Sequence, residues 1–148
     1  MPVNDREPRL TRTQIWQGLV LKAENPVPFL EAISACTVIE RGENWLLRDF
    51  TLRGEDMQER VTFEPEKRVT FVRTKSSAMG TVMNELVELD GGEMGLRFTF
   101  ELDVDGLDDG SSEEAEFADL MSRSYFQGVE STLAEIRRRV VAGELDAA

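Results

Sequence analysis

The hydrophobic residues near the C-terminus recur at steps of three and four, the spacing of one face of an α-helix. This stripe consists of Ala118, Met121, Tyr125, Val129, Leu133, Ile136 and Val140. Acidic residues precede the stripe and three consecutive arginines, residues 137–139, follow near its end, where the helix dipole favours each charge. The pattern predicts one long amphipathic helix over residues 111–142, with Ser111 as its N-cap and Gly143 as its stop.

Hydrophobic and polar residues alternate through the middle of the chain, which is typical of half-buried strands. Turn-forming residues at 41–44, 53–56, 64–67 and 90–93 separate the alternating stretches. The predicted strands are Thr37–Glu40, Trp45–Leu52, Met57–Phe63, Arg68–Thr74, Met79–Leu89 and Met94–Val104. Strands joined by such short turns form an antiparallel meander.

The segment before these strands carries helix signals. Residues 11–14, Thr-Arg-Thr-Gln, match a capping box, and apolar residues at helical spacing then predict a first helix that ends near Glu24. Phe29, Leu30 and Ile33 predict a short second helix with Pro28 in its first turn. Residues 2–10 predict a short edge strand, limited by two prolines.

These elements predict an α+β fold in one domain over residues 1–148. A curved antiparallel sheet of about seven strands has one dry face, and two short helices follow its first strand. The long C-terminal helix is the predicted element of matching length, so we expect it to cover the dry face. A bent sheet around one helix leaves a gap between them, and that gap is the candidate ligand site.

The side chains expected on the dry face follow from the alternation. Val61, Phe63, Val69, Leu96 and Leu102 are assigned there with the candidate site residues Phe71, Met83, Phe98 and Phe100, and Asn84 to the wet face. Met121 and Tyr125 are the candidates from the helix stripe. The Tyr125 hydroxyl either reaches the cavity or belongs to the core.

Three charged residues share this inward parity: Glu59, Arg73 and Glu85, from three consecutive strands. A carboxylate–guanidinium–carboxylate cluster can hold the polar end of an otherwise apolar ligand. The alternative is that these side chains reach water near strand ends or form a structural ion pair.

Composition narrows the chemistry. A net charge of −12 argues against duplex nucleic acid and anionic membrane surfaces as partners. The chain has no histidine and a single cysteine, Cys36, so a metal site, a histidine-based mechanism and a cysteine nucleophile are all disfavoured, and we expect no cofactor. An N-terminus without an apolar signal region and the lack of a long apolar stretch predict a cytoplasmic protein without membrane insertion.

The order of predicted elements resembles the helix-grip fold of the START, polyketide-cyclase and birch-pollen-allergen proteins, the SRPBCC superfamily. Local sequence is similar to its AtaL-like branch at LTRTQIWQGL (10–19), AENP (23–26), CTVIERG (36–42) and RVTFEP (60–65). The resemblance covers nearly the whole chain and implies a hydrophobic ligand cavity. It supplies no catalytic residues.

Three functions are consistent with this reading. The first is a protein that binds a small hydrophobic molecule between sheet and helix. The second is a polyketide cyclase or aromatase-like enzyme in which inward polar groups direct proton transfer. A third is a protein-binding module of the co-chaperone kind, which the superfamily also contains. The lack of histidine and of an activated nucleophile favours binding over chemistry.

Overall fold

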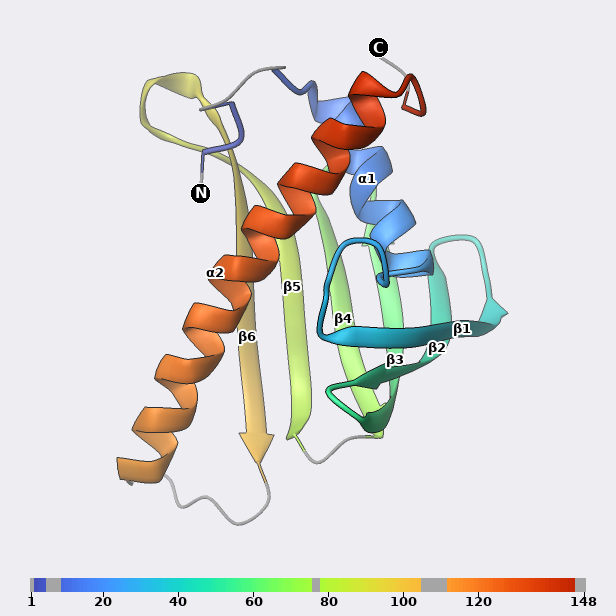
Figure 1. The fold of residues 1–148 in the computed structure, drawn as a ribbon, viewed down its shortest axis with the longest axis vertical. Coiled ribbons are helices and arrows are strands. Elements are labelled where there is room, and N and C mark those ends of the chain that lie inside the picture. Colours follow the sequence, from blue (N-terminus) through green and yellow to red (C-terminus); the bar gives the residue numbers. More distant parts are fainter. Residues whose placement is uncertain (1, 5–8, 76–77, 105–111, 146–148) are drawn as a thin grey trace.

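A computed structural model of the chain describes residues 2–4, 9–75, 78–104 and 112–145. This part of the chain folds as a six-stranded antiparallel sheet with two α-helices and one 3₁₀ turn (Figure 1). In chain order the elements are α1 (Arg12–Glu24), β1 (Ile33–Arg41), β2 (Trp45–Leu52), β3 (Glu55–Glu64), β4 (Arg68–Lys75), β5 (Ala78–Glu88), η1 (Asp90–Gly92), β6 (Met94–Val104) and α2 (Ser112–Val141).

The sheet is a meander in which each strand pairs with its neighbour in sequence, in the order β1-β2-β3-β4-β5-β6. It curves so strongly that β1 runs across the direction of β4 to β6 (Figure 1). Two register shifts in the β1–β2 ladder, between Ile33 and Ala35 and between Val38 and Glu40, contribute to this curvature, since bulges bend a strand and increase its twist.

Helix α2 lies across the concave side of the sheet (Figure 1). Val129, Leu133 and Ile136 of its stripe are buried in the same core as strand residues such as Val61 and Leu96. The predicted α+β helix-grip architecture is therefore confirmed. Among the described residues, no helix is both long enough and apolar enough to span a lipid bilayer.

Both predicted signals at the described helix ends are present. The Thr11 hydroxyl accepts from the Gln14 amide at 3.1 Å, and the Gln14 side chain accepts from the Thr11 amide at 2.9 Å. At the end of α2, Gly143 has φ +76°, and the Gly143 and Glu144 amides donate to the carbonyls of Val140 and Arg139. This paired arrangement is a Schellman motif, which the absence of a Cβ in glycine permits. The predicted N-cap Ser111 lies outside the described residues.

Helices α1 and α2 approach closely at Gly18. A Cβ at this position would lie 2.4 Å from Ile136 Cγ1, so only glycine lets the two helices pack at this distance. The contact orients α1 and thereby the side chains that α1 places over the sheet.

The short second helix does not form. The amides of Phe29 and Leu30 both donate to the Pro26 carbonyl, which makes a single turn, and Ile33 already begins β1. Three apolar residues at helical spacing were therefore too few to identify a helix, because a single hydrogen-bonded turn produces the same spacing.

The predicted N-terminal strand is reduced to one bridge, between Pro2 and Gly95, with the Val3 amide donating to the Met94 carbonyl at 3.1 Å. Residues 5–8 of that prediction lie outside the described residues. The sheet consequently has six strands where about seven were expected. The Arg137 guanidinium donates to the Val3 carbonyl and ties this segment to α2.

The two faces of β5 are opposite to the prediction. Val82 pairs with Phe71 and Asn84 with Val69, so Val82, Asn84 and Leu86 face the core. Met83 and Glu85 therefore face outward, and Glu85 forms an ion pair with Arg97 at 3.2 Å.

Candidate functional site

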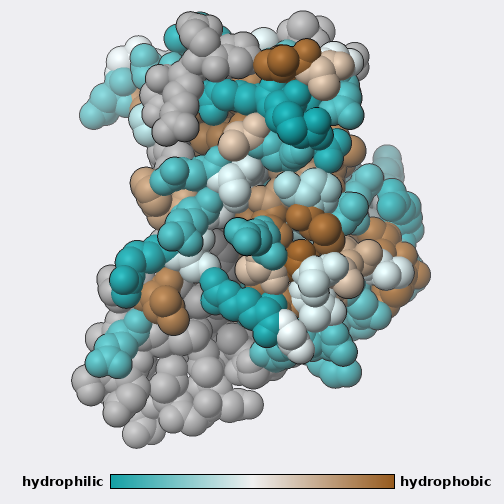
Figure 2. Space-filling model, in the orientation of Figure 1, coloured by the Kyte–Doolittle hydropathy of each residue, from teal (hydrophilic) through white to brown (hydrophobic). Residues whose placement is uncertain are grey.

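A cavity of about 450 Å³ lies between the concave face of the sheet and the middle of α2. Helix α1 contributes one residue to its wall, and the segment from Leu30 to Ile33 forms one side. The face of the molecule in Figure 2 is largely hydrophilic, with hydrophobic side chains grouped over the segment that joins α1 to β1. The lining residues are Lys22, Leu30, Glu31, Ala32, Ile33, Arg48, Phe50, Leu52, Arg53, Glu59, Phe71, Arg73, Val82, Asn84, Phe98, Ser124, Gln127, Gly128 and Ser131.

The lining on α2 is small or polar. A Cβ on Gly128 would lie 3.4 Å from Leu30 Cδ2 and 3.8 Å from Phe98 Cε2. A larger residue at this position would occupy the space between Leu30 and Phe98, so the glycine keeps this part of the cavity open.

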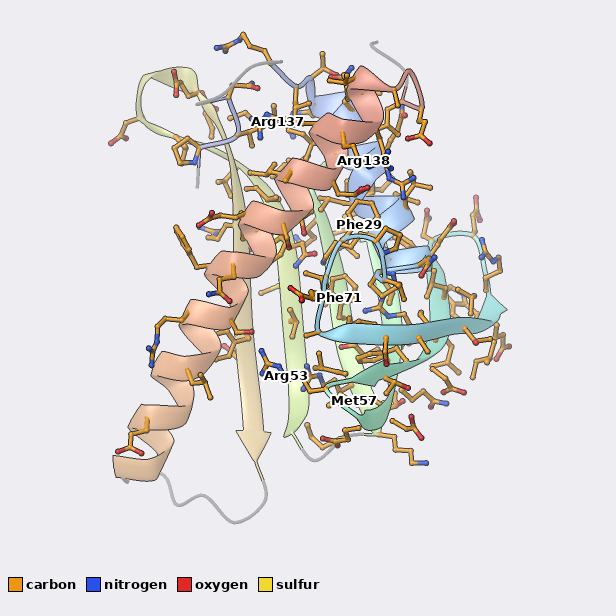
Figure 3. The ribbon with its side chains drawn as sticks, viewed as in Figure 1. Phe29, Arg53, Met57, Phe71, Arg137 and Arg138 are labelled. Carbon is orange, nitrogen blue, oxygen red and sulfur yellow. The ribbon has the colours of Figure 1, made fainter. Side chains whose placement is uncertain are left out.

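The turn between β2 and β3 connects to α2 at one edge of the cavity. Arg53 extends from this turn toward the helix (Figure 3), and its Nη2 donates to Ser124 Oγ at 2.9 Å. Arg53 has φ +49° and Gly54 φ +83°, as a type I′ hairpin turn requires.

A buried ion cluster forms the sheet wall of the cavity. Arg48 Nη2 donates to Glu59 Oε1 at 2.8 Å, and Arg73 Nε donates to Glu59 Oε2 at 3.4 Å. All three residues are at most 6% exposed. Arg48 Nη1 also donates to the Ala23 carbonyl at 2.9 Å, at the end of α1.

Lys22 enters the cavity from α1. Its Nζ donates to Asn84 Oδ1 at 2.7 Å and lies 4.7 Å from the ring centroid of Phe98 and 5.1 Å from that of Phe71. Burial and, to a lesser extent, the nearby positive charge of Arg48 lower the pKa of Lys22 from 10.5 to about 7, and the negative charge of Glu59 opposes this shift. Neutral and protonated forms of this amine are therefore both populated near neutral pH.

The aromatic residues of the wall also support Arg48. Its guanidinium carbon lies 4.9 Å from the ring centroid of Phe50 and 5.1 Å from that of Phe71. Aromatic faces attract cations, so the rings lower the free-energy cost of burying the guanidinium without adding negative charge.

The predicted site residues divide into three groups. Glu59, Arg73, Phe71 and Phe98 line the cavity together. Phe100 packs against the core, and Met83 and Glu85 face the other side of the sheet, which corrects their inward assignment. The side chains of Met121 and Tyr125 lie outside the described residues.

Sequence reasoning missed Lys22, Arg48 and Asn84, which are respectively 5%, 4% and 1% exposed. A signal for Arg48 was present, because it alternates with the buried residues Leu46 and Phe50 on β2. A weaker one existed for Lys22, which lies on the buried face of α1, three residues after Leu19.

A second hollow of about 420 Å³ lies beside β1 to β3 and includes Cys36. Burial raises the pKa of this thiol above its ordinary 9.0, so it is protonated near neutral pH and is not an activated nucleophile. Among the described residues, no three histidine, cysteine or acidic side chains gather as metal ligands would.

Several solved structures share this fold. The Zhui aromatase/cyclase from Streptomyces sp. R1128 matches with a TM-score of 0.71 and 15% identity, over 88% of this chain and 89% of that one. TTHA0849 from Thermus thermophilus matches with a TM-score of 0.61 and 16% identity, over 90% and 92% of the two chains. Ara h 8.0201 matches with a TM-score of 0.54 and 14% identity, over 90% and 91%. At such identities the likeness shows the fold alone.

No curated protein matches the chain in sequence. A family profile does match, over residues 1–143, and carries the description "Acetylaranotin biosynthesis cluster protein L". The match includes α1, the whole sheet and α2, and thus every element that lines the cavity. This chain therefore belongs to the AtaL family, within the SRPBCC-like group that the sequence resembled.

Proposed function

We propose that this protein binds a small, largely apolar molecule in the cavity between the sheet and α2. The observation that carries the proposal is the cavity itself, whose volume of about 450 Å³ lies within the range of roughly 300–1,000 Å³ typical of small-molecule sites. Its wall combines apolar side chains such as Ile33, Phe71 and Phe98 with polar groups, and ligand sites likewise combine an apolar lining with polar groups that orient the ligand.

Position 128 offers a direct test. Gly128→Leu is expected to weaken binding of the neutral fluorescent probe N-phenyl-1-naphthylamine by about tenfold or more, because the new side chain fills the space between Leu30 and Phe98. The measurement is a fluorescence titration of the native protein and the variant.

Gly128→Ala is the matched control. Its single methyl group makes only ordinary van der Waals contacts, so this variant should bind the probe and gain up to about 1 kcal/mol of helix stability. Far-UV circular dichroism verifies that all three proteins are folded. Equal binding by the native protein and Gly128→Leu would show that the probe lies elsewhere, and the cavity would lose its assigned role.

The alternative function is a cyclase-like enzyme, which one observation favours. Lys22 carries an amine that is partly neutral at pH 7, and it lines the same cavity as the guanidinium groups of Arg48 and Arg73. A neutral amine can take the acidic proton of a bound dicarbonyl compound and become an ammonium, while the guanidinium groups stabilise the enolate that remains.

This alternative is tested by proton exchange rather than by product formation. In D₂O, the native protein should accelerate exchange of the central CH₂ protons of benzoylacetone, followed by NMR, roughly tenfold over buffer at the same pH. Lys22→Met should lose the acceleration and Lys67→Met, at an exposed lysine, should keep it. Exchange at the buffer rate would remove proton abstraction from the functions of this cavity.

A further inference from the structure

The charges of the described residues that line the cavity do not balance. These residues include four basic ones, Lys22, Arg48, Arg53 and Arg73, and two acidic ones, Glu31 and Glu59. The whole chain has the opposite bias, with 17 basic and 29 acidic residues. An excess of positive charge is therefore concentrated in this cavity of an otherwise acidic protein.

The excess is greatest on the buried part of the wall. Lys22, Arg48 and Arg73 are between 4% and 6% exposed, and Glu59 is the acidic residue that contacts two of them. Arg48 Nε is also buried without a hydrogen-bond partner among the described residues. A buried charge without a counter-ion is costly, so a structure that retains several cations around one carboxylate has a place for a second anion.

Among the described residues, the groups that line the cavity with Lys22 supply no second buried anion. Strands β2, β3 and β4 contribute Arg48, Glu59 and Arg73 to the same cavity wall, whereas the described lining residues of β5, β6 and α2 are uncharged. These uncharged residues are Val82, Asn84, Phe98, Ser124, Gln127, Gly128 and Ser131. Glu31 lies on the remaining side, in the exposed segment before β1. No acidic residue other than Glu59 and Glu31 lines this cavity among the described residues.

We propose that the ligand is an organic acid. It has an apolar body about the size of a small ring system and a single carboxylate that binds between Lys22, Arg48 and Arg73. The inference rests on the proposed binding function and names the class of ligand. The apolar body of the acid contacts the region bordered by Leu30, Ile33 and Gly128. The carboxylate supplies a second negative charge beside that of Glu59 and accepts charge-assisted hydrogen bonds from the basic groups.

A carboxylate in this place has a measurable effect on Lys22. The anion favours the protonated amine and raises the pKa of Lys22 above its value of about 7 in the free protein. At pH 8 the free amine is mostly neutral, so the binding of an acid is accompanied by uptake of a proton from the buffer, approaching one per ligand bound. A neutral ligand of the same shape produces no such uptake.

The experiment compares 2-naphthoic acid with 2-naphthamide by isothermal titration calorimetry of the native protein at pH 8. Repeating both titrations in triethanolamine and in Tris, two buffers without an anionic group that differ in ionisation enthalpy, gives the number of protons taken up. The acid should bind roughly tenfold to hundredfold more tightly than the amide and take up a proton, since hydrogen bonds to charged groups contribute about 1.5–3 kcal/mol.

The other outcomes distinguish failure of the organic-acid assignment from failure of the proposed binding function. Equal binding of acid and amide without proton uptake would leave the proposed binding function intact and overturn the organic-acid assignment. If N-phenyl-1-naphthylamine binds but neither 2-naphthoic acid nor 2-naphthamide does, the organic-acid assignment is likewise overturned and the binding function stands. Failure of all three compounds to bind would overturn the binding function and the assignment together.

Variants locate the effect. Lys22→Met should abolish proton uptake and reduce the acid's advantage over the amide, whereas Lys67→Met, on the β3–β4 turn, should change neither. Circular dichroism shows whether Lys22→Met is folded. If it is not, the proton uptake of the native protein still decides the question, because that measurement needs no variant.

Discussion

Glu59→Gln is expected to lower the free energy of unfolding by about 3–5 kcal/mol, measured by urea denaturation at pH 7. Glu59 is 3% exposed and its two oxygens accept hydrogen bonds from Arg48 and Arg73. Glutamine has nearly the same shape, so the substitution removes the charge and little of the packing. Two guanidinium groups then remain buried without the carboxylate that compensates them.

The matched control is Glu64→Gln. Glu64 forms an ion pair with Arg68 at 2.7 Å, but both side chains are about half exposed, 51% and 41%. Exposed pairs of this kind contribute at most about 1 kcal/mol, so this variant should unfold nearly as the native protein does. If the two variants cost the same, water reaches the Glu59 cluster and its charges are not buried as described.

The expected loss is large for a domain of this size, since total stabilities are about 5–15 kcal/mol. Buried ion clusters can often be replaced by apolar residues without loss of stability. The cluster of Arg48, Glu59 and Arg73 is therefore an inefficient way to stabilise the sheet, and this favours a role in binding. The same charges that make Glu59→Gln costly provide the anion site proposed above.

Most of the fold followed from local sequence patterns because its signals are local. Strands β2 and β6 have the predicted bounds, since both are flanked by turn residues and β6 also alternates clearly. The first helix begins at its predicted capping box, and Gly143 ends the last helix through its positive φ. Each of these features depends on residues within a few positions of one another.

The faces of β5 could not be chosen from local sequence. Met83 and Val87 alternate with Val82 and Leu86, so both faces are equally apolar. The choice depends on pairing with β4, which places Val82 beside Phe71. That register is a tertiary property, and a shift of one residue moves every side chain to the other face.

The candidate site was predicted in part for a related reason. Glu59 and Arg73 were found because their strands have unambiguous faces, and the two residues pair directly in the β3–β4 ladder. Lys22 and Arg48 were missed because a basic residue in a helix or strand is normally solvated. Their spacing relative to buried neighbours, Leu46 and Phe50 for Arg48 and Leu19 for Lys22, was the available signal, and the charge of each residue argued against it.

The second large effect concerns pH. Between pH 7 and 8.5 the free energy of unfolding is expected to increase by about 1 kcal/mol per pH unit, from Lys22 alone. The pKa of Lys22 is about 7 in the folded protein and near 10.5 in the unfolded chain. In this window the unfolded chain therefore binds up to one more proton than the folded protein. Proton binding stabilises the unfolded chain, and this stabilisation weakens as the pH rises. This contribution of Lys22 to the free energy of unfolding is fully present above pH 10.5 and is lost as the pH falls to about 7.

Urea denaturation of native protein, Lys22→Met and Lys67→Met at several pH values in this window measures the effect. Lys22→Met should remove the increase with pH, because methionine fills similar space without a titrating group, whereas Lys67→Met should retain it. The window stops at 8.5 because the raised pKa of Cys36 acts in the opposite direction above its ordinary 9.0. A slope unchanged by Lys22→Met would mean that Lys22 is protonated in the folded protein throughout the window. The wall would then contain three permanent cations, proton uptake on binding an acid would be absent, and the amine would be unable to act as the base of a cyclase.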